Sequence, residues 1–335
     1  MQALTILISD VTSHKELERI LQELRHQSDQ NFNVALILND NSPKLYATIE
    51  QALVTFGQRL SFMVNNKSRT TQVDLRDIWH RITTDYMFVT SCANSFKPNV
   101  IKNLNQALAQ HQPDIFEFAP EFCAGVRWKP KSRLAAEFYP NLQASKELYA
   151  YAFPFLFNKV FKTKLFQQLH TAELYVSNDS TFYSLLSFLL MQVAQSYQFD
   201  ETTYVTVTID NNAKLPITSY YEDMKKIELM VRSVYPDLVQ EVNYNVSYFL
   251  QVVLLSMLEY WHYPFGAKLF KEKDRNSLVS HNNRAKMLLK KNIEKRNKSL
   301  SKDLLANKYM QLHNPEAEFL NLDFIKTLPQ GDEQL

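Results

Sequence analysis

The sequence has very little glycine. Only 4 of its 335 residues are Gly, whereas an average usage near 7% would give roughly 23. Neither G-x-G-x-x-G nor G-x-x-x-x-G-K-S/T occurs. These are the loops whose backbone amides hold phosphates in dinucleotide-binding proteins and in P-loop NTPases. The sequence therefore excludes both of those classes.

Cysteine and long apolar runs are also scarce. Cys92 and Cys123 are too few for a disulfide framework, and no C-x-x-C offers a structural zinc site. The first residues lack the basic start of a signal peptide. The longest apolar runs, 182–194 and 246–258, are about 13 residues long and fall short of the ~20 that span a bilayer. We expect a cytoplasmic protein, soluble or at most peripheral at the inner face of the membrane.

The overall charge is nearly balanced. There are 37 Lys and Arg residues against 35 Asp and Glu, which gives a net charge of +2. A chain with this balance is not marked as a general binder of nucleic acid or other polyanions. Any basic surface must therefore be local.

Apolar runs typical of buried strands alternate with helical patterns through the first part of the chain. The runs cover residues 4–11, 32–38, 60–64 and 86–90. Such alternation predicts a parallel sheet with helices on both faces, which binds ligands beyond the carboxyl ends of its strands. Those ends lie at residues 10–13, 39–42, 65–69 and 91–94.

The two expected helices between these runs have recognisable starts. Ser13 and Glu16 fit a capping box, and Pro43 after Ser42 fits the first position of a helix. After about residue 216 the pattern is almost entirely helical. We therefore predict an α/β domain over residues 1–215, followed by an α-helical C-terminal domain over residues 216–335.

Five segments in this order and spacing resemble the family 2 glycosyltransferases over residues 3–210. ILI at 6–8 resembles the family's first strand, and NDNS at 39–42 resembles its Asp-Asp-Gly-Ser turn. LRD at 75–77, which precedes YMFV at 86–89, resembles the family's Ala-Arg-Asn segment before a Tyr-Ile-x-Phe strand. NKVF at 158–161 resembles its Asn-Lys-Leu-Phe element, and NDSTF at 178–182 resembles its Glu-Asp-x-x-Phe motif. The resemblance implies a GT-A-like nucleotide-sugar-binding fold.

The resemblance also implies roles for individual residues. Asp40 would bind the base of a nucleotide sugar, UDP-sugar first among the donors, and Arg76 would meet the diphosphate. Asp179 would be the general base of an inverting transfer to an acceptor hydroxyl. Each residue has a structural alternative: Asp40 in a helix-entry turn, Arg76 on a solvated helix face, and Asp179 as a carboxylate at a helix N-terminus.

The chain departs from the family where the Asp-x-Asp metal motif should stand. It reads SCAN at 91–94, so Ser91 and Ala93 replace both carboxylates, and Asn94 is the one metal-capable side chain left nearby. We therefore predict no metal site here, with Ser91 and Asn94 facing the donor. Basic residues would balance the diphosphate instead. The candidates are Arg69, Arg76, Arg127 and Lys129.

A basic amphipathic segment lies at 284–305. Over residues 284–302, eight basic residues and one acid give a charge of +7, with apolar residues at helical spacing. The segment fits an anionic membrane surface or a lipid-borne acceptor. It also fits nucleic acid, or a solvated face of a packed helix.

Three functions remain open from the sequence. The first is an inverting, metal-independent glycosyltransferase that acts on a lipid or polysaccharide acceptor. The second is a catalytically inactive relative that binds ligands or acts as a scaffold, which the missing carboxylates favour. The third and weakest is a nucleic-acid binder that uses the basic C-terminal helices. Retention of Asp179 favours the first.

Overall fold

The computed structural model of the protein describes residues 4–65, 71–123, 127–169, 181–209, 216–260, 272–311 and 320. The chain divides into two compact units. The first comprises residues 1–123, 127–145 and 155–209, and the second comprises residues 124–126, 146–154 and 210–335. The division into domains at residue 215 stays a prediction, because compactness alone does not show that a segment folds independently.

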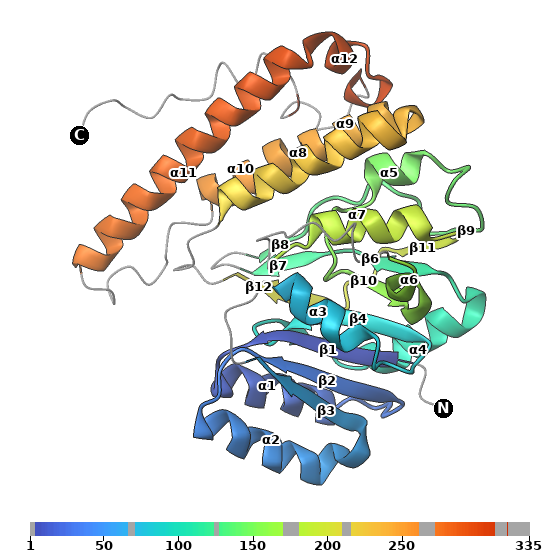
Figure 1. The fold of residues 1–335 in the computed structure, drawn as a ribbon, viewed down its shortest axis with the longest axis vertical. Coiled ribbons are helices and arrows are strands. Elements are labelled where there is room, and N and C mark those ends of the chain that lie inside the picture. Colours follow the sequence, from blue (N-terminus) through green and yellow to red (C-terminus); the bar gives the residue numbers. More distant parts are fainter. Residues whose placement is uncertain are drawn as a thin grey trace. The chain divides into compact units, whose positions relative to one another are not determined.

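The first unit contains a mainly parallel sheet. Among the described residues, its strands lie in the order β3-β2-β1-β4-β10-β6-β11-β9. β1 (Leu4–Val11) is parallel to both of its neighbours, β2 (Phe32–Leu38) and β4 (Tyr86–Ser91), and β3 (Leu60–Val64) pairs with β2 (Figure 1). This confirms the predicted α/β fold class. The remaining strands are β6 (Ile115–Phe118), β9 (Phe138–Tyr139), β10 (Lys159–Lys162) and β11 (Tyr197–Asp200).

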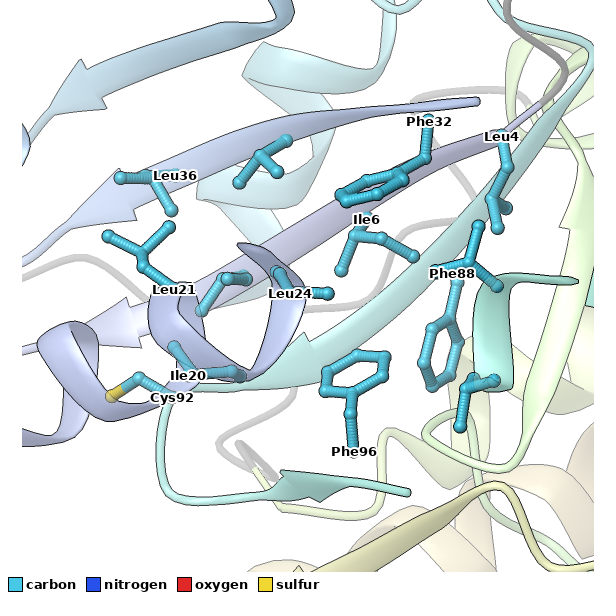
Figure 2. Close-up of a cluster of buried hydrophobic side chains, with 14 of the residues drawn as sticks. Leu4, Ile6, Ile20, Leu21, Leu24, Phe32, Leu36, Phe88, Cys92 and Phe96 are labelled. Carbon is cyan, nitrogen blue, oxygen red and sulfur yellow. The ribbon is translucent and has the colours of Figure 1, made fainter. Parts of the chain in front are cut away.

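Three helices cover one face of this sheet. They are α1 (His14–Arg25), α2 (Pro43–Phe56) and α4 (Val100–His111). Alternate residues of the strands, such as Leu4 and Ile6, join the apolar faces of these helices in one buried cluster (Figure 2). The two-residue period of a strand directs these side chains to the same face.

The opposite face carries α3 (Thr71–Trp79), which lies across β1 from α1 and α2 (Figure 1). The Trp79 ring packs against Phe166 of α6 (Thr163–Gln168), with centroids 5.3 Å apart. α6 in turn contacts α7 (Ser184–Val193). The prediction of helices on both faces is therefore confirmed.

The predicted helix starts differ in how they are capped. The Ser13 hydroxyl accepts a hydrogen bond from the Glu16 amide at 3.4 Å, as the capping-box pattern predicted. Pro43 opens α2 as expected, but the Ser42 side chain makes no capping hydrogen bond. Proline needs no such partner for its own nitrogen, because it has no N–H.

A second, smaller sheet lies in the same unit, in the order β5-β12-β7-β8. It is formed by β5 (Ser95–Phe96), β7 (Glu121–Cys123), β8 (Arg127–Trp128) and β12 (Val205–Thr208). β5 follows the segment 91–94 directly. The small sheet therefore adjoins the carboxyl end of β4.

The described part of the second unit is helical. Its main elements are α5 (Glu147–Tyr151), α8 (Ile217–Val234), α9 (Val239–Ser247), the π-helix Tyr248–Leu254, α10 (Leu255–Tyr260), α11 (Glu272–Ser299) and α12 (Ser301–Leu305). Among the residues the structure describes, no helix is both long and apolar enough to cross a membrane.

Candidate active site

Polar side chains meet where β1 and β2 end. The Asn39 Nδ2, just past β2, donates to the Asp10 Oδ1 at 2.7 Å. Asp10 has a φ of 54°, and the register of β1 against β2 shifts between Ile8 and Val11. A bulge of this kind turns a side chain out of the regular pleat. The carboxylate of Asp10 is thus fixed at the edge of the sheet where parallel folds bind ligands.

Tyr183 reaches the same carboxylate from the start of α7. Its hydroxyl lies 3.5 Å from the Asp10 Oδ2 and 3.4 Å from the Ser9 Oγ. Like Asp10, Tyr183 has a positive φ, 51°. Sequence reasoning did not select Asp10 or Tyr183 as site residues. The sequence signal for Asp10 is its place at the end of an apolar strand run, where parallel sheets bind ligands. Asp40 likewise follows shortly after such a run.

The predicted base-binding residue Asp40 follows Asn39 and is half-buried. Its Oδ1 accepts a hydrogen bond from the Asn41 amide at 2.8 Å, which shapes the entry to α2. The buried Oδ1 of Asn39 accepts no hydrogen bond within the described chain. This corner therefore has acceptor atoms for a ligand's N–H or O–H groups.

The turn at 91–94 is held by one arginine of α1. The Arg19 guanidinium donates to the carbonyl oxygens of Cys92, Ala93 and Asn94 at 2.9, 2.9 and 3.0 Å. It also donates to the Ser95 Oγ at 2.6 Å. Binding by one planar donor group fixes the turn at the end of β4.

Two of the predicted donor-binding residues lie in this turn. The Ser91 Oγ accepts the Ala93 amide at 3.3 Å. Asn94 is buried, and its amide is engaged at both ends, donating to the Thr90 Oγ1 at 3.1 Å and accepting from the Thr208 amide at 3.3 Å. Asn94 thereby ties β4 to the small sheet. Its role toward a donor stays a prediction.

Cys92 is buried behind the turn. Its thiol donates weakly toward the Glu16 Oε2 at 3.6 Å. Burial, together with the nearby Glu16 carboxylate, raises the pKa of the Cys92 thiol to about 12. The thiolate is the nucleophilic form, so this cysteine is unsuited to attack at neutral pH.

Basic side chains gather on the small sheet. Lys97 and Lys129 both reach the Glu121 Oε2, at 3.2 and 3.1 Å. Burial alone would raise the pKa of the Glu121 carboxyl, but hydrogen bonds from Thr206 and the two lysines lower it to about 2. Sequence reasoning proposed Lys129 and missed Lys97. Two cations on one acid leave a net positive charge here.

The other proposed phosphate-binding residues lie in different places. The Nε of Arg76 in α3 is 3.6 Å from the Asp77 Oδ1, and both side chains are about one-third exposed. Arg127 is exposed on β8. Arg69 lies outside the described residues. Whether Arg76 meets a diphosphate stays a prediction.

Comparison with known proteins identifies the fold. No family model and no curated protein matches this sequence. Among solved structures, S. aureus TarS 1-349 has a TM-score of 0.59 and 13% identity, covering 97% of this chain and 89% of that chain. TarS 1-349 with UDP-GlcNAc has a TM-score of 0.58 and 12% identity, covering 97% and 90%. This chain has a GT-A-like glycosyltransferase fold.

The GT-A-like fold raises the question of a divalent metal at its Asp-x-Asp position. Here Ser91 and Ala93 offer no carboxylate, and the Asn94 amide already has partners. Among the described residues, no group of three His, Cys, Asp or Glu side chains could hold a metal ion. Hard cations require several oxygen ligands. The described side chains therefore do not fit a divalent metal at this position.

Of the two further motifs of the resemblance, the structure describes the one that contains Asn158 and Lys159. Asp179 lies outside the described residues, so its role as base stays a prediction. Asn158 and Lys159 are fully buried. Lys159 pairs with the Glu117 Oε1 at 2.9 Å, and the Asn158 Nδ2 donates to the same oxygen at 3.1 Å. This motif therefore joins β10 to β6 inside the sheet.

The second unit exposes a row of four basic residues and one leucine on α11. Arg284, Leu288, Lys291, Lys295 and Lys298 alternate at four and three residues and are all exposed. This spacing places them along one helix face. Arg296, in the same basic segment, is not exposed.

Arg296 is buried, and its Nε donates to the Glu228 Oε1 at 2.9 Å. The basic segment 284–302 therefore exposes less charge than its +7 suggests. The exposed row still contains four cations and one apolar side chain.

Proposed function

We propose that this protein is a glycosyltransferase that uses a nucleotide sugar. The observation that carries the proposal is the likeness to TarS with UDP-GlcNAc over 97% of this chain. The acceptor atoms at Asp10, Asn39 and Asp40 support it, because they lie at the sheet edge where such folds bind nucleotides. A UDP-sugar is the preferred donor, since TarS is also solved with UDP.

The reaction requires three contributions from the chain. Asp10 and Asp40 accept hydrogen bonds from the nucleoside, and Lys97, Lys129 or Arg76 balances charge on the diphosphate. The acceptor oxygen attacks the anomeric carbon from the side opposite the diphosphate. A new carbon–oxygen bond forms, the bond to the phosphate oxygen breaks, and the acceptor proton moves to Asp179. This route inverts the anomeric centre and needs no metal.

A non-catalytic relative is the second candidate. Ser91 and Ala93 stand in place of the metal-binding carboxylates, and Arg19 holds the turn that carries them. Such a protein would bind the nucleotide without turnover. The two candidates share the binding step and differ in the chemical step.

The deciding experiment separates these steps. UDP and UDP-GlcNAc binding is measured by calorimetry, and sugar transfer or hydrolysis by release of UDP. We expect Asp179→Asn to keep UDP affinity and to lower kcat by roughly 10²-fold or more, as loss of a general base does. Glu201→Gln, an exposed acid, is the control and should change neither.

The outcomes of this experiment distinguish the candidates. UDP binding without any turnover across a panel of nucleotide sugars would favour the non-catalytic relative. No UDP binding at millimolar concentration would remove both. Equal activity in Asp179→Asn and the wild type would exclude Asp179 as the base.

We further propose that the exposed row on α11 contacts an anionic membrane at its inner face, where a lipid-borne acceptor would lie. The row combines Arg284, Lys291, Lys295 and Lys298 with Leu288, which is 43% exposed. Each basic residue near an anionic lipid surface contributes ~1 kcal/mol, and the apolar side chain can enter the headgroup layer. This contact would place a cytoplasmic enzyme beside its acceptor.

Vesicle sedimentation tests the membrane contact. Reversing Lys291, Lys295 and Lys298 to Glu should weaken binding to anionic vesicles by roughly 100-fold or more, because three favourable charges become unfavourable. The matched control reverses Lys15, Lys44 and Lys102, three exposed lysines of the first unit. Equal binding by the two triple variants would reject the contact. Tighter binding to oligonucleotides than to vesicles would favour the nucleic-acid alternative.

A further inference from the structure

A cleft of about 740 Å³ with both polar and apolar lining residues opens at the other end of the sheet. It is lined by residues around the start of β4 and by the ends of α3, α4 and β10, among them His80, Asp85, Gln112, Thr163 and Gln167. All of these belong to the first unit. The volume falls within the range of small-molecule sites, which is roughly 300 to 1,000 Å³.

The cleft is separate from the candidate active site. It lies at Tyr86, the first residue of β4, whereas the candidate active site follows Ser91, the last. Residues of a strand rise ~3.3 Å each, so the two ends are roughly 17 Å apart. A single sugar could not contact both places at once.

The charges that line the cleft are already compensated. Lys162 and Lys164 reach the same oxygen of Asp114, at 3.0 and 3.4 Å. Burial raises the pKa of the Asp114 carboxyl, but hydrogen bonds from the Gln195 amide and Lys162 and the charges of both lysines lower it overall. Asp85 is the carboxylate that lines the cleft, whereas Asp114 is the partner of the lining lysines. Counted with Asp114, the two lysines and two carboxylates sum to zero, so no excess of their charge favours an ion.

Two lining residues carry a polar atom that lacks a partner. The Thr163 Oγ1 and the Asn105 Oδ1 are buried and make no hydrogen bond within the described chain. Both atoms need a side-chain rotation to meet a ligand, and a rotation of about 120° of Thr163 about its Cα–Cβ bond moves its hydroxyl to another staggered position. The amides of Gln112 and Gln167 also line the cleft.

The lining also contains apolar residues. Ile82, Leu108 and Ala109 line the same cleft. Alternating hydroxyl and C–H surface is the property of a sugar ring, and buried polar atoms require partners that a ring hydroxyl supplies. The two lysines that an anion would need are already paired with Asp114.

We propose that this cleft is a second ligand site, which binds a neutral saccharide away from the candidate active site. The proposal stands on the cleft and does not depend on transfer activity. If the chain transfers sugars, such a site would hold a part of a glycan distant from the reacting hydroxyl.

Calorimetry on the full chain tests this proposal, with glucose, galactose, mannose, N-acetylglucosamine, maltotriose and chitotriose as probes up to tens of millimolar. Ala109→Trp places a ring in the cleft and should abolish saccharide binding. Thr163→Val removes one hydroxyl and should weaken binding about three- to tenfold. Ala47→Trp, on the exposed face of α2, should bind like the wild type. All three variants should keep their UDP affinity.

Four outcomes would overturn the proposal. In the first two, no saccharide binds, or Ala109→Trp binds the saccharide as well as the wild type does. In the other two, UDP displaces the saccharide, or inorganic phosphate binds and Ala109→Trp abolishes that binding. Gln167→Trp, at an exposed position of α6, blocks the cleft from its other side if Ala109→Trp does not fold. A failure of UDP binding would affect the proposed function and leave this test intact.

Discussion

Two acids of the same sheet have very different surroundings. Glu117 of β6 is fully buried and is bound by the Lys159 ammonium, the Asn158 amide and, at 2.6 Å, the Tyr197 hydroxyl. Asp10 of β1 is partly exposed and accepts from the Asn39 amide and the Tyr183 hydroxyl.

The difference separates a structural acid from a candidate binding acid. Burial is costly for a charge unless a counter-charge and hydrogen bonds compensate it, and Glu117 has both. Burial lowers the pKa of the Lys159 ammonium, although Glu117 opposes this change. Asp10 retains exposure at a strand end, in a backbone conformation that non-glycine residues adopt infrequently. A ligand can reach Asp10 and cannot reach Glu117.

The largest expected effect is on the buried pair. Lys159→Met leaves the Glu117 carboxylate buried without its cation and should lower the free energy of unfolding by about 3 to 5 kcal/mol. Urea denaturation measures the change. Lys162→Met is the matched control on the same strand; its ion pair with Asp114 is partly exposed, so we expect a loss near ~1 kcal/mol. Equal losses in the two variants would contradict the structural role of Glu117.

A smaller effect is expected at the strand-end acid, on binding. Asp10→Asn or Asp40→Ala should weaken UDP binding by about 1.5 to 3 kcal/mol, roughly 10- to 150-fold, because a hydrogen bond to a charged acceptor is lost. The unfolding free energy should change little. Asp29→Asn, at the amino end of β2, serves as the control in the same calorimetric titration. Unchanged affinity in Asp10→Asn would remove Asp10 from the nucleotide site.

The smallest effect concerns metal. Without carboxylates at 91 and 93, UDP affinity should stay the same in manganese and in EDTA, and any turnover should survive the chelator. The double variant Ser91→Asp with Ala93→Asp supplies two oxygen ligands at the end of β4 and should bind UDP more tightly with manganese than without it. Strong activation of the wild type by manganese would show that acids elsewhere hold the ion.

Local sequence pattern was sufficient to predict the first half of the fold. The runs at 4–11 and 32–38 match β1 and β2, because continuous apolar residues suit strands buried on both faces. The capping box at Ser13 and the proline at 43 start their helices as predicted. The order of the five motifs implied the GT-A-like fold by resemblance. ILI, YMFV and NKVF lie on β1, β4 and β10 and NDNS follows β2, whereas LRD lies in α3.

Tertiary structure decided which residues share a site. Asp10 and Tyr183 are separated by 173 residues in sequence, so no local pattern could pair them. The same holds for Arg19, which binds the turn at 91–94 from another element. It also decided that Arg296, one of eight cations in a basic segment, is buried against Glu228. Composition and spacing determine which face a residue can take, but its partners come from elements far away along the chain.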